Sequence, residues 1–154
     1  MNRIEASSLG AVVMAGAAAL SLGWGTSASA QTVLSSSDPG VLALGQPICS
    51  ENCVPCHCAK LKGQPNWWSL NQDSQLPAPP HYGTNQTWHH NGETLFRLSK
   101  YGTGALIGNP DYVSNMPIYR GVLADDVIIA ALSYIKSTFP QEIRKTHDET
   151  ENRQ

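Results

Sequence analysis

The ten residues from Cys49 to Cys58, CSENCVPCHC, contain all four cysteines of this 154-residue chain. Four thiols this close together cannot all do the same job, so the first question is which of them carry chemistry. Cys53 and Cys56 stand out because two residues separate them and His57 follows directly. Several kinds of site share this spacing, and features elsewhere in the chain favour one of them.

Three kinds of site fit the chain poorly. Cys49, Cys53 and Cys56 have the triple-cysteine spacing of radical S-adenosylmethionine enzymes, but those enzymes need a barrel of many βα units, which is more chain than is present. A thioredoxin-like thiol–disulfide site follows a buried strand, and no strand pattern precedes Cys53. A structural zinc site takes two separated ligand pairs. In addition to the cysteines, the sequence has only His89-His90 as a candidate second pair, and its spacing is not that of a zinc finger.

The sequence Cys53-Val54-Pro55-Cys56-His57 is the Cys-x-x-Cys-His pattern of c-type haem attachment. Each thiol adds across one vinyl group of the porphyrin, which gives two thioether bonds to adjacent corners of the ring. The next residue, His57, is then placed to ligate the iron through an imidazole nitrogen. The pattern therefore predicts one covalently bound haem c.

The N-terminus predicts export, which covalent haem attachment of this kind requires. Arg3, an apolar run from Leu9 to Leu22 and the ending Ala28-Ser29-Ala30 are the three parts of a secretory signal peptide. Cleavage of residues 1–30 would leave about 124 residues, which fits one domain. The apolar run is shorter than the roughly 18 residues of a membrane span, which argues against an uncleaved anchor. The protein is therefore expected in the oxidising periplasm.

Methionine usage points to a second iron ligand. Met1 and Met14 fall in the predicted signal peptide, so Met116 is the single methionine of the mature chain. A lone methionine is commonly core filler. Met116, however, lies in a polar loop with a proline directly after it, SNMPIYRG, and a thioether there has the reach and the rigid turn that the sixth ligand of a haem iron needs.

The rest of the chain has helical patterns and no strand pattern. Helix starts are predicted at the Asp38-Pro39 cap, at the Asn91 cap of NGETLFRLSKYG, which Gly102 ends, and within LADDVIIAALSYIKSTFP, which Pro140 ends. The first helix either kinks at Pro47 or begins near Gln46. Residues 62–91 have neither a helix nor a strand period, and residues 141–154 are predicted as a polar tail of frayed helix or disorder. We therefore expect an all-α domain, residues 31–140, with long loops.

Charge and composition narrow the function. The net charge is −2 and no run of lysine or arginine is present, so the electrostatic footprint of nucleic-acid binding is missing. Large aliphatic residues are sparse and glycine and proline plentiful, so the apolar core is expected to be thin. A prosthetic group that fills the interior would relieve that shortage.

In four segments the chain resembles the monohaem class I cytochromes c, and the similarity covers residues 41–139. GQPICSENCVPCH is similar to the family's first helix, APPHYG to its Gly-Pro-x-Leu loop, NMPIY to the loop of the axial methionine, and LSYIKS to its terminal helix. The resemblance implies the cytochrome c fold, with three or more helices and long loops wrapped around one covalently bound haem. It also implies that Gly45 and Ile48 of the first helix pack on the terminal helix, where Tyr134 is the aromatic contact.

Carried over residue by residue, the resemblance makes Cys53 and Cys56 the thioether anchors and His57 and Met116 the axial ligands. It implies that the backbone carbonyl of Pro79 accepts a hydrogen bond from the second nitrogen of His57, which would fix the ring and raise its basicity. Pro80 is the alternative acceptor, because the matching loop is short.

Three residues depart from the family pattern. His81 stands where the loop usually has an apolar residue, Cys49 where the helix contact is often aromatic, and Cys58 where a small residue often follows the ligand histidine. The last two suggest, as a hypothesis, a Cys49–Cys58 disulfide, with two separate semi-buried thiols as the alternative. The disulfide requires the chain to turn back after Cys56, because a straight helix would hold the two residues too far apart.

These features predict an electron carrier rather than an enzyme, passing one electron between respiratory or dehydrogenase partners. The expected partners are redox proteins, a dehydrogenase or a terminal oxidase, met transiently; the protein is expected to be a monomer that reaches the membrane only through partner complexes. If Met116 did not ligate, a five-coordinate haem would bind or sense a gas or peroxide, and a thioredoxin-like oxidoreductase is the remaining alternative.

Trp88-His89-His90 is expected to cover the core or contact a haem propionate, and Trp67-Trp68 to pack on the haem or core.

Overall fold

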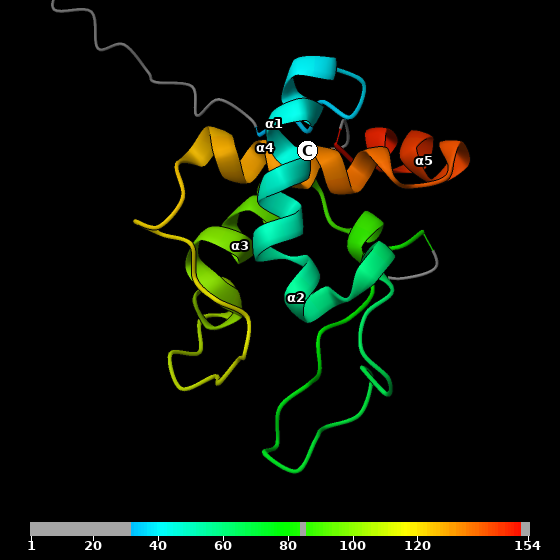
Figure 1. Ribbon diagram of the computed structural model, residues 1–154. Helices are drawn as coiled ribbons and strands as arrows, with labels where there is room; N and C mark the ends of the chain where they lie inside the picture. The colour runs from blue at the N-terminus through cyan, green and yellow to red at the C-terminus, as the bar shows by residue number, and fades with distance from the viewer. Residues whose placement is uncertain (1–31, 84–85, 152–154) are drawn as a thin grey trace, which may run out of the picture.

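The computed structural model describes residues 32–83 and 86–151 (Figure 1) and has no strand in those residues. The helices in chain order are α1 (Pro39–Asn52), α2 (Val54–His57), α3 (Gly92–Ile107), α4 (Asp125–Ser137) and α5 (Gln141–Glu151), with the 3₁₀ turns η1 (Ala59–Leu61) and η2 (Thr87–His89). The expected all-α class is confirmed. None of these helices is long and apolar enough to cross a membrane. The predicted signal peptide lies outside the described residues.

Helix α1 begins at the predicted Asp38-Pro39 cap. The Asp38 carboxylate accepts hydrogen bonds from the N–H groups of Gly40 and Val41 at 2.8 and 3.1 Å, which satisfies two of the donors that a helix start leaves open. The helix continues through Pro47 to Asn52 instead of starting near it. Pro47 lies on the exposed side of α1, where the carbonyl that loses its donor can be hydrated.

Helix α3 is longer than the sequence predicts. The Asn91 side chain caps it by accepting a hydrogen bond from the N–H group of Thr94 at 2.8 Å, as expected. Gly102, the predicted end, has φ 83° and ψ 164°, a conformation that glycine adopts without strain. A further helical turn follows as far as Ile107, so Gly102 divides the element without ending it.

Helices α1 and α4 cross in direct contact (Figure 1). Gly45 lies at the crossing, and a methyl group on it would overlap the carbonyl oxygen of Ala130. The helix contact that the resemblance implies at Gly45 is therefore present, and Tyr134 packs half-buried beside the core. That core consists of buried side chains from α1, α3, α4 and the loops, among them Leu34, Cys49, Leu95, Phe96, Ile128, Leu132, Ile135 and Phe139.

The sequence predicts a frayed helix or disorder over residues 141–154. The structure instead has a regular helix, α5, from Gln141 to Glu151. The buried positions of α5 are His147 and Glu151, four residues apart on one face. Because polar side chains occupy that face, the hydrophobic pattern gives no sign that it is buried. Pro140 follows the end of α4 and directly precedes the first residue of α5, so it marks the start of a helix as well as the end of one.

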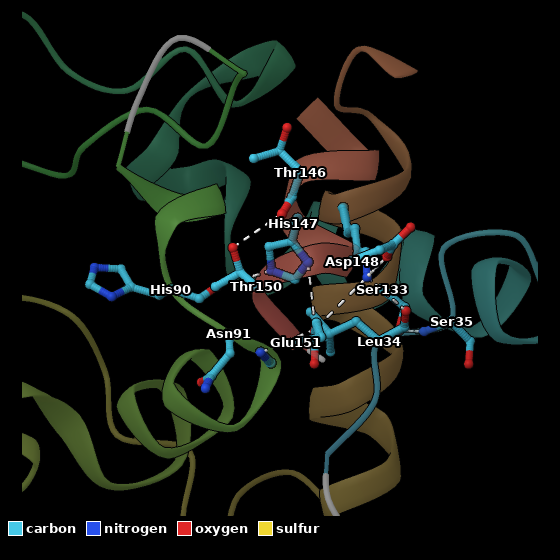
Figure 2. Close-up of polar contacts among 12 residues, drawn as sticks. Leu34, Ser35, His90, Asn91, Ser133, Thr146, His147, Asp148, Thr150 and Glu151 are labelled. Carbon is cyan, nitrogen blue, oxygen red and sulfur yellow. Dashed lines mark hydrogen bonds and ion pairs between the residues drawn. The ribbon is translucent and has the colours of Figure 1, made fainter. Parts of the chain in front are cut away.

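A polar cluster fixes α5 to three other segments (Figure 2). The His147 imidazole donates from Nε2 to the backbone carbonyl of His90 at 3.0 Å, and Glu151 accepts from the first N–H group of α3, that of Gly92, at 3.2 Å. Lys136 of α4, only 2% exposed, pairs with Asp148 at 2.7 Å. Its ammonium also donates to the Leu34 carbonyl at 3.3 Å. These contacts join the start of the described chain, the start of α3 and both final helices.

We expect the acid stability of the protein to depend on His147. Burial, followed by the Lys136 ammonium, lowers the pKa of His147 from 6.5 to about 4, so the unfolded chain binds the proton first as the pH falls. The free energy of unfolding should therefore decrease between pH 6.5 and about 4, by roughly 2–3 kcal/mol from this group. Urea unfolding across that range should show the decrease, and His147→Gln should flatten it.

The wild type and the His147→Gln variant both contain Glu151, whose titration also contributes to the pH dependence. Burial raises its pKa, so its ionised form costs stability at neutral pH and this cost is relieved as the pH falls, opposite in sign to the effect of His147. Because His147 Nδ1 lies 3.5 Å from the Glu151 carboxylate, the difference between the two pH profiles reports the titration of His147 together with its contact with Glu151. Parallel profiles would contradict its assignment as a buried neutral imidazole.

Candidate functional site

One cavity of about 340 Å³ lies among α1, α3, α4 and the two long loops. Its wall includes all five residues singled out from the sequence, namely Cys53, Cys56, His57, Pro79 and Met116. Much of the remaining wall is apolar and comes from α3 and α4, including Leu95, Leu98, Ile128, Leu132 and Ile135. The fold therefore brings potential donors from three separate parts of the chain to one apolar cavity.

The two thiols and His57 come from one helical turn. The N–H group of Cys53 donates to the Cys49 carbonyl at 2.9 Å, and the Cys53 carbonyl accepts from the N–H group of His57 at 2.8 Å. Cys53 thus ends α1 and opens α2, with the thiols of Cys53 and Cys56 both half-buried. The chain reverses at Cys58, which has φ 63° and ψ 165°.

The His57 ring is buried and held by a backbone carbonyl. Its Nδ1 atom lies 2.6 Å from the carbonyl oxygen of Pro79, and the residue is 6% exposed. Of the two prolines that the sequence offers, Pro79 is the one that makes this bond. A neutral imidazole that donates from Nδ1 keeps the lone pair of Nε2. Burial lowers the pKa of His57, while the bond to Pro79 opposes that shift, so the neutral form is favoured.

The loop that carries Pro79 is fixed on both sides of it. The N–H group of Gln64 donates to the Ala78 carbonyl at 2.9 Å, and that of His81 donates to the Leu61 carbonyl at 2.8 Å. Gly63 packs directly on the Pro79-Pro80 backbone with φ 73°, a combination of close approach and left-handed conformation that favours glycine. Pro79 is therefore positioned by the segment that immediately follows α2.

Met116 is half-buried in the loop between α3 and α4. Its N–H group donates to the Ser114 hydroxyl at 3.1 Å, and Pro117 follows. Just beyond, the N–H group of Tyr119 donates to the Ser99 carbonyl at 3.2 Å, which ties the loop to α3. The Tyr119 hydroxyl also donates to the Asn52 carbonyl at 2.9 Å. These bonds anchor the segment after Met116 to both α3 and the end of α1.

His81 and Thr87 form a hydrogen-bonded pair next to His57, which the sequence did not predict. The His81 and His57 rings face each other with centroids 3.9 Å apart and planes at 31°. His81 Nδ1 is also hydrogen-bonded to the hydroxyl of Thr87 at 2.9 Å. Burial, followed by the proximity of His57, lowers the pKa of His81 to about 3, so the ring is neutral. His81 was visible as a departure from the family loop, whereas no local pattern singles out Thr87.

The hypothesis of a Cys49–Cys58 disulfide is wrong in this structure, because both are free thiols. Cys49 lies one helical turn before Cys53, is 1% exposed and shares a hydrogen bond with its thiol. That bond, followed by burial, raises the pKa of Cys49. Cys58 lies beyond the end of α2, with its sulfur 3.8 Å from the Cys56 carbonyl oxygen. The reversal at Cys58 comes too late to carry its thiol back to Cys49.

The tryptophan segments have different surroundings. Trp88 stacks on His89 with centroids 3.7 Å apart and packs half-buried on the core, which agrees with the expected cover of the core. Trp67 and Trp68 contact each other edge to face. Trp68 is 66% exposed, so the expectation that both pack on an interior group is wrong for Trp68.

Searches against family models, curated proteins and solved structures return no match to this chain. In residues 32–83 and 86–151, no three Cys, His, Asp or Glu side chains are grouped so that they could hold a metal ion by themselves.

Replacing Gly63 with alanine should destabilise the protein more than replacing Gly108. Both glycines are left-handed, with φ 73° and 69°, so alanine carries a similar backbone cost of about 1–2 kcal/mol at either position. At Gly63 the new methyl group also overlaps the Pro79-Pro80 backbone, whereas at Gly108 no atom lies within 4 Å. Urea unfolding should give the larger loss for Gly63→Ala. Equal losses would show that the contact with Pro79 does not restrain the loop.

Proposed function

We propose that this protein is an electron carrier that holds one haem c through Cys53 and Cys56, with His57 and Met116 as the axial ligands of the iron. The observation that carries the proposal is that both thiols, the imidazole and the thioether line one cavity. Each is a donor that haem c uses: thiols for the two vinyl groups, and imidazole and thioether for the iron.

The residues present fit this prosthetic group. A cavity of about 340 Å³ is within the range of roughly 300–1,000 Å³ that is usual for cofactor sites. Its wall is rich in leucine and isoleucine from α3 and α4, which suits a porphyrin face. His57 donates from Nδ1 to Pro79 and keeps Nε2 for a metal. The group would also complete a core that is thin by composition.

Bound haem would supply reversible one-electron exchange between Fe(III) and Fe(II). In this proposal the thiols of Cys53 and Cys56 anchor the ring, and the Pro79 carbonyl sets the orientation and basicity of the His57 imidazole. The thioether of Met116 would bind the iron and favour its reduced form, and the apolar wall would exclude water. No side chain has to gain or lose a proton, which is why a carrier is favoured over an enzyme.

We propose that this function is carried out in the periplasm, because residues 1–30 have the pattern of a secretory signal peptide. The proposed partners are redox proteins, a dehydrogenase that supplies the electron and a terminal oxidase or a carrier that accepts it. Encounters of this kind use small interfaces and are short-lived, so a monomer that exchanges partners is the proposed working state.

A second candidate, a thiol–disulfide oxidoreductase, is favoured by one observation. Cys53 is the N-cap residue of α2, and its hydrogen bond with the Cys49 thiol lowers the pKa of Cys53 although burial opposes the shift. A lowered thiol pKa is typical of reactive cysteines. This candidate gives no role to the bond between His57 and Pro79 or to Met116 at the same cavity, so the haem protein is the stronger proposal.

The absorption spectrum of the purified mature protein tests the proposal. A Soret band that stays with the polypeptide under denaturing conditions is expected, together with a low-spin reduced α band and a weak near-infrared band from methionine on Fe(III). Mass spectrometry should show that Cys49→Ala keeps the covalent haem, whereas Cys53→Ala and Cys56→Ala each lose one thioether bond. A wild-type protein without a Soret band would overturn the proposal and leave the thiol oxidoreductase.

Met116→Ala should convert the spectrum to high-spin iron or to replacement ligation by a histidine, because the sixth donor is removed. Val113→Ala is the matched control, since Val113 is in the same loop, lines the same cavity and is 66% exposed. The control should keep the near-infrared band. If wild-type iron is already high-spin, the Met116 assignment fails and a five-coordinate haem that binds or senses small molecules takes its place.

A further inference from the structure

The buried polar contact between His81 and His57 has no role in the proposed function so far. His81 is held at two points: its backbone N–H group donates to the Leu61 carbonyl at 2.8 Å, and its ring atom Nδ1 is hydrogen-bonded to the Thr87 hydroxyl at 2.9 Å. Thr87 itself is buried, at 7% exposure, in the first position of η2. With the backbone fixed at position 81 and the ring tied at Nδ1, the His81 imidazole has a defined orientation.

The surface that His81 offers meets the face of the His57 ring. The ring centroids lie 3.9 Å apart and the planes are tilted by 31°, so the two rings are in close contact. The Pro79 carbonyl contacts His57 at the ring edge, through Nδ1. One hydrogen bond leaves a ring free to pivot about the bond axis, and a flat neighbour on its face removes that freedom.

We propose that His81, fixed by Thr87, is a positioning residue that sets the plane of the His57 imidazole. Pro79 fixes the position of Nδ1, and His81 fixes the rotation of the ring about that bond. An apolar side chain at position 81 would fill the space but would neither bond to Thr87 nor present a fixed plane. This inference rests on the proposed function, in which His57 is the axial ligand and the ring plane governs its overlap with the orbitals of the iron.

Two variants and one control test the inference in the haem-loaded protein. His81→Leu removes the ring and the bond to Thr87, while Thr87→Val keeps the ring and removes only the hydroxyl at nearly constant shape. Tyr82→Leu is the control, because Tyr82 is the next residue of the same loop, is 48% exposed and is not among the residues that line the cavity. The readouts are the g-values of the low-spin ferric iron by electron paramagnetic resonance and the midpoint potential.

Both test variants should shift or broaden the g-values and shift the midpoint potential in the same direction, His81→Leu more than Thr87→Val, while Tyr82→Leu matches the wild type. Should His81→Leu fail to fold, Thr87→Val decides alone. Low-spin g-values and potentials that match the wild type in the test variants would overturn the positioning role and leave the proposed function intact. A wild-type protein without a Soret band would overturn both.

Discussion

The crossing of α1 and α4 at Gly45 is the constraint on which the rest of the structure depends. With no side chain at this position, the helix meets the backbone of Ala130 directly, at a separation that any larger residue would prevent. Both helices then line the cavity, α1 through Ile48 and Asn52 and α4 through Ile128 and Leu132. The end of α1 is thereby delivered to the cavity, and the turn that carries Cys53 and His57 follows immediately.

Features fixed by short-range chemistry were predictable from the sequence. Asp38 and Asn91 cap their helices because a side-chain oxygen reaches an N–H group two or three residues ahead, and such contacts depend on little else. The same holds for the turn from Cys53 to His57, whose spacing alone puts two thiols and an imidazole on one helical turn. Pro79 and Met116 line the same cavity from two other segments, but spacing did not predict them: the resemblance pointed to Pro79, and methionine usage together with the resemblance pointed to Met116.

Features that depend on distant partners were not predictable in this way. Thr87 is paired with His81 across a loop, and no period or cap distinguishes it from other threonines. Cys58 fails as a partner for Cys49 because the helix stays regular up to Asn52 and the chain reverses only at Cys58 itself. Helix α5 was missed for a related reason: the buried His147 donates its N–H group to the His90 carbonyl, a partner far away in sequence.

The charges on α4 explain how a helix that lines the cavity is held from both ends. Asp125, in its first turn, pairs with Lys100 of α3 at 2.6 Å, and Lys136, in its last turn, pairs with Asp148 of α5. Each charge has the sign that its end of the helix dipole favours. The Asp125 pair is exposed and contributes little, whereas the Lys136 ammonium is buried, so losing its partners would strand a charge in the interior. Helix α5 is therefore part of the support of the cavity wall, although none of its residues lines the cavity.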